Sequence, residues 1–66
     1  MVSIEEHQFM IEHYQSIIFL SDLKIVIQLK KKQIEITGTN LYIDYFSHYE
    51  IRGKGTIEQV RFTPCH

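Results

Sequence analysis

The 66-residue sequence contains no alanine and no tryptophan, and it has only one proline, one cysteine and three glycines. Alanine is the best helix former, so its absence argues against a helical bundle. The single cysteine, Cys65, cannot close an intramolecular disulfide, which excludes a disulfide framework. The longest apolar run is Ile17–Leu20, far short of the ~20 residues that a membrane-spanning helix needs, so no direct membrane span is expected.

An excess of charge of either sign is also missing. Seven basic and eight acidic side chains give a formal net charge of −1. A nucleic-acid-binding domain needs a basic surface to neutralise phosphates, so no nucleic-acid partner is expected. The segment Met1–Glu6 has neither the basic nor the apolar part of a signal peptide. Together with the absence of disulfides, this favours a cytoplasmic location.

The residues that are abundant favour β-structure. Eleven isoleucines are present, and Ile, Val, Tyr, Phe and Thr together supply 26 of the 66 residues. These side chains suit a pleated, half-buried surface. A domain of this size buries only about 60% of the surface that its unfolded chain exposes, so self-association often supports so thin a core. We therefore predict one small all-β domain over residues 1–66, completed by another subunit.

Alternation with a period of two predicts the strands. Apolar and other side chains alternate between Leu23 and Lys30, as expected for a strand with one buried face. The apolar run Ile17–Leu20 indicates a short strand that is buried on both faces or that pairs two layers. Gly38 is expected to end a strand, with Thr39–Asn40 as a tight connection. The whole pattern predicts an antiparallel meander of about six short strands, near residues 9–13, 17–20, 23–30, 34–37, 41–45 and 50–62.

The last predicted strand is irregular. Ile57 and Val60 are three positions apart, so they share a face of the strand only if one extra residue lies between them. We therefore predict a β-bulge near Glu58–Gln59. Gly53 and Gly55 leave gaps on the inner face of this strand. Such gaps indicate a bend or the close approach of another backbone.

Residues with catalytic or metal-binding chemistry do not form a recognisable site. No two of the four histidines have the spacing of a zinc site. Cys65 beside His66 lies at the chain end, where an oriented base and a sheltered site are not expected. The acidic side chains fall on the polar faces of the predicted strands, which are normally solvated. We therefore expect no enzyme, no catalytic residue, no metal and no cofactor.

An aromatic cluster is the best candidate for an interaction surface. Tyr42, Tyr45 and Tyr49, with Phe46 between them, occupy one strand and the turn after it. Exposed aromatic side chains are favoured at protein interfaces, although in a small domain they equally serve to complete the core. The predicted interface consists of Tyr42, Tyr45, Phe46, Tyr49, Gly53 and Gly55. An alternative is a small regulatory or anion-binding module, with a concave site near His48, Arg52 and Lys54.

The order and spacing of these features resemble the YabP/YqfC family of sporulation proteins, with the YqfC branch the more similar. The resemblance is carried by Ile-x-Ile-x-Gly-x-x-Leu-x-Ile over Ile34–Ile43, by Glu50–Ile51, and by Gly-x-Ile-Glu-Gln-Val-x-Phe over Gly55–Phe62. The strand that ends in an aromatic-x-Ser-Asp turn at Ile17–Asp22 fits the same branch. The match covers roughly residues 4–62.

This resemblance implies a non-enzymatic protein of endospore formation that acts in spore envelope assembly in the mother-cell cytoplasm. It implies a membrane-associated sporulation protein as a partner, which would hold the chain near a membrane that it does not span. The family has no assigned catalytic residues and no cofactor to carry over. Together with the thin core, it leads us to expect a homo-oligomer or an adaptor.

Overall fold

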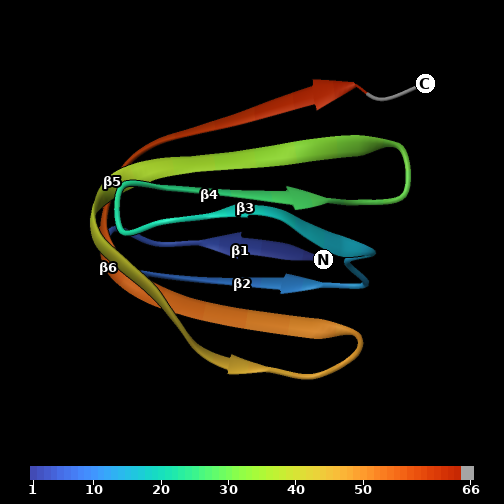
Figure 1. The fold of residues 1–66 in the computed structure, drawn as a ribbon, viewed down its shortest axis with the longest axis horizontal. Helices are drawn as coiled ribbons and strands as arrows, with labels where there is room; N and C mark the ends of the chain where they lie inside the picture. The colour runs from blue at the N-terminus through green and yellow to red at the C-terminus, as the bar shows by residue number, and fades with distance from the viewer. Residues whose placement is uncertain (65–66) are drawn as a thin grey trace.

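Residues 1–64 are described by the computed structural model, and they form six β-strands and no helix. Cys65 and His66, and the expectation of an unreactive thiol there, lie outside the described residues. All neighbouring strands are antiparallel, in the order β1-β2-β6-β5-β4-β3 (Figure 1). The predicted all-β antiparallel meander of six strands is confirmed. The strands are β1 Val2–Ile4, β2 Gln8–Glu12, β3 Ser16–Leu20, β4 Lys24–Gln28, β5 Lys32–Phe46 and β6 Glu50–Pro64.

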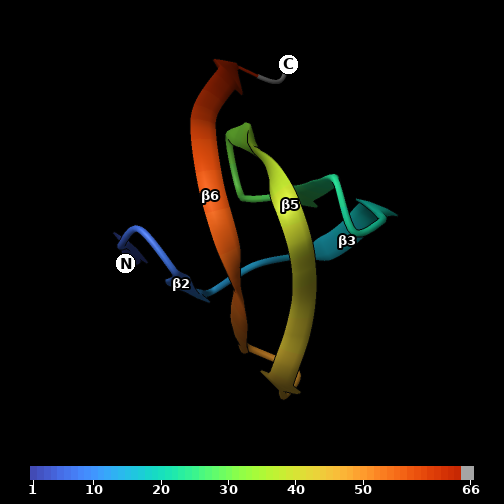
Figure 2. The same cartoon turned by 90° about the vertical axis from the view of Figure 1, so that its left-hand side faces the viewer.

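The long hairpin of β5 and β6 organises the sheet. Each strand has 15 residues and curves strongly, so that the two halves of the hairpin face each other (Figures 1 and 2). β4 pairs with the first half of β5, and β2 pairs with the first half of β6. One layer therefore contains β3, β4, the start of β5 at Lys32 and the end of β6 at Pro64, which we call the Lys32 end of the hairpin. The other layer contains β1, β2, the end of β5 at Phe46 and the start of β6 at Glu50, which we call the Phe46 end. The link from β2 to β3 crosses from one layer to the other.

Three register shifts accompany this curvature. Ile57 pairs with Gly38 and Gln59 pairs with Thr37, so Glu58 is an extra residue, which confirms the predicted β-bulge near Glu58–Gln59. Further shifts occur in β5 between Thr39 and Tyr42 and between Ile43 and Tyr45. Bulges bend a strand and increase its twist. The prediction that Gly38 ends a strand before a tight connection at Thr39–Asn40 is wrong, because β5 continues through these residues as a single bent strand.

The two predicted glycine gaps are sites of close approach. Gly55 has a φ of +133°, and a Cβ placed on it would lie 2.6 Å from the carbonyl oxygen of Asn40 on β5. Gly53 pairs with Phe9, whose ring occupies the space that a side chain at Gly53 would need. Larger residues at either position would therefore push apart the strands that form the bend.

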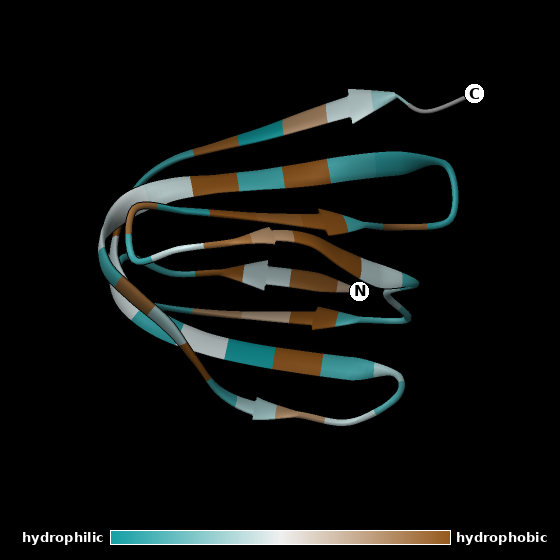
Figure 3. Ribbon diagram, viewed as in Figure 1, coloured by the Kyte–Doolittle hydropathy of each residue, from teal (hydrophilic) through white to brown (hydrophobic). Residues whose placement is uncertain are grey.

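The core lies between the two layers and consists largely of isoleucine. Along much of the hairpin, apolar and polar residues alternate (Figure 3), and in β4 the buried Ile25 and Ile27 alternate with less buried residues. Burying an isoleucine side chain contributes roughly 1.5–3 kcal/mol. The buried residues are Phe9, Ile11, Ile25, Ile27, Leu29, Ile34, Ile36, Leu41 and Ile51, of which six isoleucines have no exposed surface.

The expectation that Ile17–Leu20 is buried on both faces is wrong. This segment lies in β3, the last strand at one edge of the sheet, and all five residues of β3 are exposed. Leu23, expected on a buried face, is also exposed because it lies in the turn before β4. β3 pairs only with β4, so it lacks the second neighbour that covers a central strand.

The bend at Gly55 can be tested by substitution. We expect Gly55→Ala to lower the free energy of unfolding by about 1–3 kcal/mol, because the added Cβ meets the Asn40 carbonyl and the positive φ is strained for alanine. Thr56→Ala, at the exposed neighbouring position, is the control and should change it by well under 1 kcal/mol. Urea denaturation measures both, and equal losses for the two variants would contradict the role of Gly55.

A charge cluster on the outer surface gives a pH-dependent prediction. Glu35 accepts a hydrogen bond from Arg61 at 2.7 Å and pairs with the Lys24 ammonium at 3.2 Å. The Arg61 hydrogen bond, followed by the Lys24 contact, lowers the pKa of Glu35 in the folded protein. The stability that this ionised carboxylate contributes is therefore present above its unfolded pKa, about 4.3, and is lost as the pH falls through the lower folded value.

Glu35→Gln should accordingly reduce the loss of stability between pH 5 and pH 2, while lowering stability slightly at pH 7. The effect is expected to be small, because the ion pairs are largely solvated. Urea midpoints over this pH range measure it. Glu58→Gln, at an exposed position on β6, is the control and should keep the wild-type pH profile.

Candidate functional site

The aromatic residues of the predicted interface lie at one end of the β5–β6 hairpin. Tyr42, Tyr45 and Phe46 are at the end of β5, and Tyr49 is in the loop that follows. Between 49% and 70% of the surface of each is exposed, with Phe46 the most exposed. They therefore do not complete the core, which was the other interpretation of the cluster.

A bulge brings two of these rings to the same face. Tyr42 pairs with Lys54, and Tyr45 pairs with Arg52, although three positions separate the two tyrosines. The register shift between Ile43 and Tyr45 accommodates the extra residue. Both tyrosines therefore lie in the outward row of β5, whereas their spacing in a regular strand would place them on opposite faces.

The loop that carries Tyr49 is held in place by hydrogen bonds. Ser47 donates its backbone N–H to the carbonyl of Glu50 at 2.8 Å, and its Oγ accepts from the Glu50 N–H at 3.2 Å. The hydroxyl of Tyr14 donates to the Ser47 carbonyl at 2.5 Å, and the N–H of His13 donates to the Tyr49 carbonyl at 2.6 Å. The β2–β3 link therefore fixes the loop that carries Tyr49 from a distant part of the chain.

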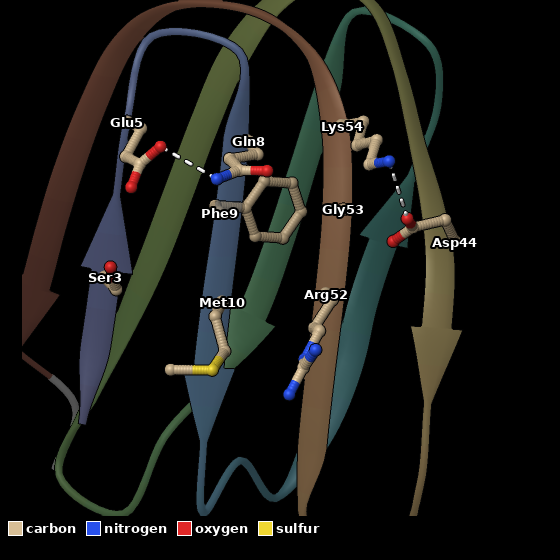
Figure 4. A pocket seen from close by; sticks show the side chains of 9 residues that line it. All are labelled: Ser3, Glu5, Gln8, Phe9, Met10, Asp44, Arg52, Gly53 and Lys54. Carbon is tan, nitrogen blue, oxygen red and sulfur yellow. Dashed lines mark hydrogen bonds and ion pairs between the residues drawn. The ribbon is translucent and has the colours of Figure 1, made fainter.

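Basic and apolar side chains continue the aromatic surface across β6 to β2. The guanidinium carbon of Arg52 lies 5.6 Å from the centre of the Tyr45 ring, within the range of a cation–π contact. Met10 is the partner of Arg52 in the register with β2, and both side chains project outward side by side (Figure 4). We call Tyr42, Tyr45, Phe46, Tyr49, Arg52 and Met10 the aromatic surface; Phe46 pairs with the buried Ile51 and so lies in the other row of β5, exposed at the end of the hairpin.

A hollow of about 450 Å³ adjoins this surface on β1, β2, β5 and β6 (Figure 4). Phe9 and Gly53 belong to its lining, and polar side chains surround them. Glu5 accepts a hydrogen bond from Gln8 at 2.8 Å, and Asp44 pairs with Lys54 at 3.5 Å. The lining residues are Ser3, Glu5, Gln8, Phe9, Met10, Asp44, Arg52, Gly53 and Lys54.

The basic residues of the anion-binding alternative are compensated by carboxylates. Arg52 lies 2.5 Å from a carboxylate oxygen of Glu50, and this hydrogen bond raises the pKa of the guanidinium. Lys54 has Asp44 as its partner. His48 does not line the hollow, and its ring instead contacts the edge of Tyr49, with 4.8 Å between the ring centres. The structure therefore brings two of the three predicted residues together, without an excess of positive charge.

The two glycines of the predicted interface serve the fold. Gly53 is buried beside the ring of Phe9, and Gly55 is half-buried at the bend. Tyr14, in contrast, has a positioning role that sequence reasoning missed. Its partner Ser47 is 33 residues away, and no local pattern indicates that the β2–β3 link meets the β5–β6 loop.

No protein-family model, curated protein or solved structure matches the chain. Within residues 1–64, no three histidine, cysteine or acidic side chains are placed to share a metal ion. The same part of the chain contains no helix able to cross a membrane.

The anchoring role of Tyr14 can be tested by removing one oxygen atom. Tyr14→Phe should lower the free energy of unfolding by about 0.5–1.5 kcal/mol and speed amide hydrogen exchange in the 47–50 loop, because the Ser47 carbonyl loses its donor. Tyr42→Phe, which alters an exposed ring, is the matched control and should leave both values near wild type. Unchanged loop exchange in Tyr14→Phe would show that the link does not hold the loop.

Proposed function

We propose that the protein is a non-enzymatic assembly or adaptor factor of endospore formation that works through protein–protein contacts. The observation that carries this proposal is the aromatic surface, in which four large rings are exposed on one anchored hairpin. The resemblance of residues 4–62 to the YabP/YqfC family supplies the biological setting, which is spore envelope assembly in the cytoplasm of the mother cell.

The chemistry of the aromatic surface supports an interface. Tyr, Phe, Met and Arg are the residue types enriched where proteins meet, and Tyr and Arg are frequent among the residues that dominate binding energy. Tyr45, Arg52 and Met10 occupy one cross-strand row on this surface. The row lies on hydrogen-bonded, paired strands, with the bulge between Ile43 and Tyr45 beside it, so little backbone entropy would be lost when a partner covers it.

The proposed partners are a membrane-associated sporulation protein and further copies of this chain. The first would hold the domain against a membrane through a contact and not through a span. Self-association is supported by the small size of the core, which within residues 1–64 contains nine buried apolar side chains. A partner that covers the exposed rings would add apolar burial that 66 residues cannot provide alone.

A pull-down from sporulating cells tests the proposal, with membrane fractions retained and the tagged full chain as bait. We expect the wild type to recover one specific membrane protein, an untagged copy of itself, or both. Phe46→Ser and Tyr45→Ser should weaken recovery of the membrane protein by about thirtyfold, as expected when a central aromatic residue is truncated.

The matched control is Phe62→Ser, which removes a ring about as exposed as that of Tyr45 from the opposite end of the hairpin. It should recover the membrane protein as the wild type does. Recovery of neither a membrane protein nor a second copy by the wild type would overturn the proposed function. Equal losses in all three variants would overturn the role of the aromatic surface.

A further inference from the structure

A second apolar surface lies on the other layer of the sheet, at the edge strand β3. Ile17, Ile18, Phe19 and Leu20 are between 39% and 53% exposed, and Leu23 in the adjoining turn is 58% exposed. None of the five belongs to the core or packs against it as a partly buried residue. β3 thus presents consecutive apolar side chains to solvent on a strand that has one hydrogen-bonded neighbour.

The two edges of the sheet differ in how they are protected. Soluble proteins usually shorten an exposed edge strand or place charges on it, because its free N–H and C=O groups are a template for another chain. β1 follows this rule, since it has three residues and is followed directly by the exposed carboxylates of Glu5 and Glu6. β3 carries no charged residue between Tyr14 and Ser21, and its only such device is the register shift at Ile18, since a bulge can twist an edge away from pairing.

We propose that β3 pairs antiparallel with β3 of a second copy of this chain, across a two-fold axis near Ile18. This inference rests on the self-association in the proposed function and assigns the surface responsible. Antiparallel pairing of identical strands places the central residue against itself and Ile17 against Phe19. A charge near the centre would face its own copy, and β3 carries none. The register shift between Ile17 and Phe19 leaves Ile18 without a partner on β4.

The area available sets the strength and the size of the assembly. The exposed parts of the five apolar side chains amount to on the order of 500 Å² per copy, which is an upper limit because they lie on both faces of β3 and in the turn, and which is below the ~800 Å² per partner of a standard interface. We therefore expect a weak, transient dimer that dissociates on dilution. Because the β1 edge is short and charged, pairing through β3 closes at two copies and does not extend into a filament.

Sedimentation velocity over a dilution series of the full chain tests the pairing. We expect the wild type to be a dimer at high micromolar concentration that dissociates on dilution. Ile18→Lys and Ile18→Glu should each raise the dissociation constant at least tenfold, because the two-fold axis opposes like charges. An equimolar mixture of these two variants should associate again, since lysine then faces glutamate.

Two further measurements keep the outcomes distinct. Far-UV circular dichroism and urea midpoints should show that both Ile18 variants fold. If one of them does not fold, Ile18→Thr, which retains strand propensity, is measured in its place. Phe46→Lys, on the aromatic surface, is the matched control and should dimerise like the wild type.

Dimerisation lost in Phe46→Lys but kept in the Ile18 variants would overturn the β3 pairing and leave the proposed function standing. Species larger than a dimer would overturn the closed arrangement. A wild type that stays monomeric at ~1 mM would overturn self-pairing, whether or not the pull-down recovers a membrane protein. Recovery of that protein by the wild type but not by the Ile18 variants would assign the edge to the other partner.

Discussion

The structure depends on one constraint, the close contact of β5 and β6 at the bend near Gly55. A six-stranded sheet with one isoleucine face has nothing to cover that face unless it folds over itself. The positive φ of Gly55 and its lack of a Cβ, which would lie 2.6 Å from the Asn40 carbonyl oxygen, together with the three register shifts, allow both strands to curve. The inward isoleucines of the two layers then meet, and the hydrophobic effect stabilises the curved form.

This constraint also decides where the aromatic side chains go. The space between the layers is filled by six fully buried isoleucines and a few neighbours. Within residues 1–64, Phe9 is the only aromatic residue that is fully buried, and its ring fits because Gly53 opposite it has no side chain. Tyr14 packs against the core while partly buried, and the remaining rings lie outside so narrow an interior. The narrow isoleucine core is therefore one physical reason why these rings are exposed, and it acts in addition to any use of the rings in binding.

The sequence predicts the inward faces well, because a period of two is a local signal. It identifies Ile25 and Ile27 as one face and the bulge at Glu58 as a break in phase. It does not predict that β5 continues through Gly38, since glycine before Thr-Asn also fits a turn. It cannot assign β3, because an uninterrupted apolar run has no polar face, and its burial depends on which strands become its neighbours. The shared exposure of Tyr42 and Tyr45 depends on a second bulge that leaves no mark in the hydrophobic pattern.

The positions of the two exposed apolar surfaces bear on how an adaptor would work. β3 belongs to one layer and the aromatic surface to the Phe46 end of the hairpin, in the other layer. A dimer joined through β3 would therefore keep both copies of the aromatic surface free. Two linked copies engaging a partner that is itself confined to a membrane would gain avidity of 10²- to 10⁴-fold without any new contact. A weak edge contact and a modest aromatic contact would then suffice together, where neither suffices alone in a domain of this size.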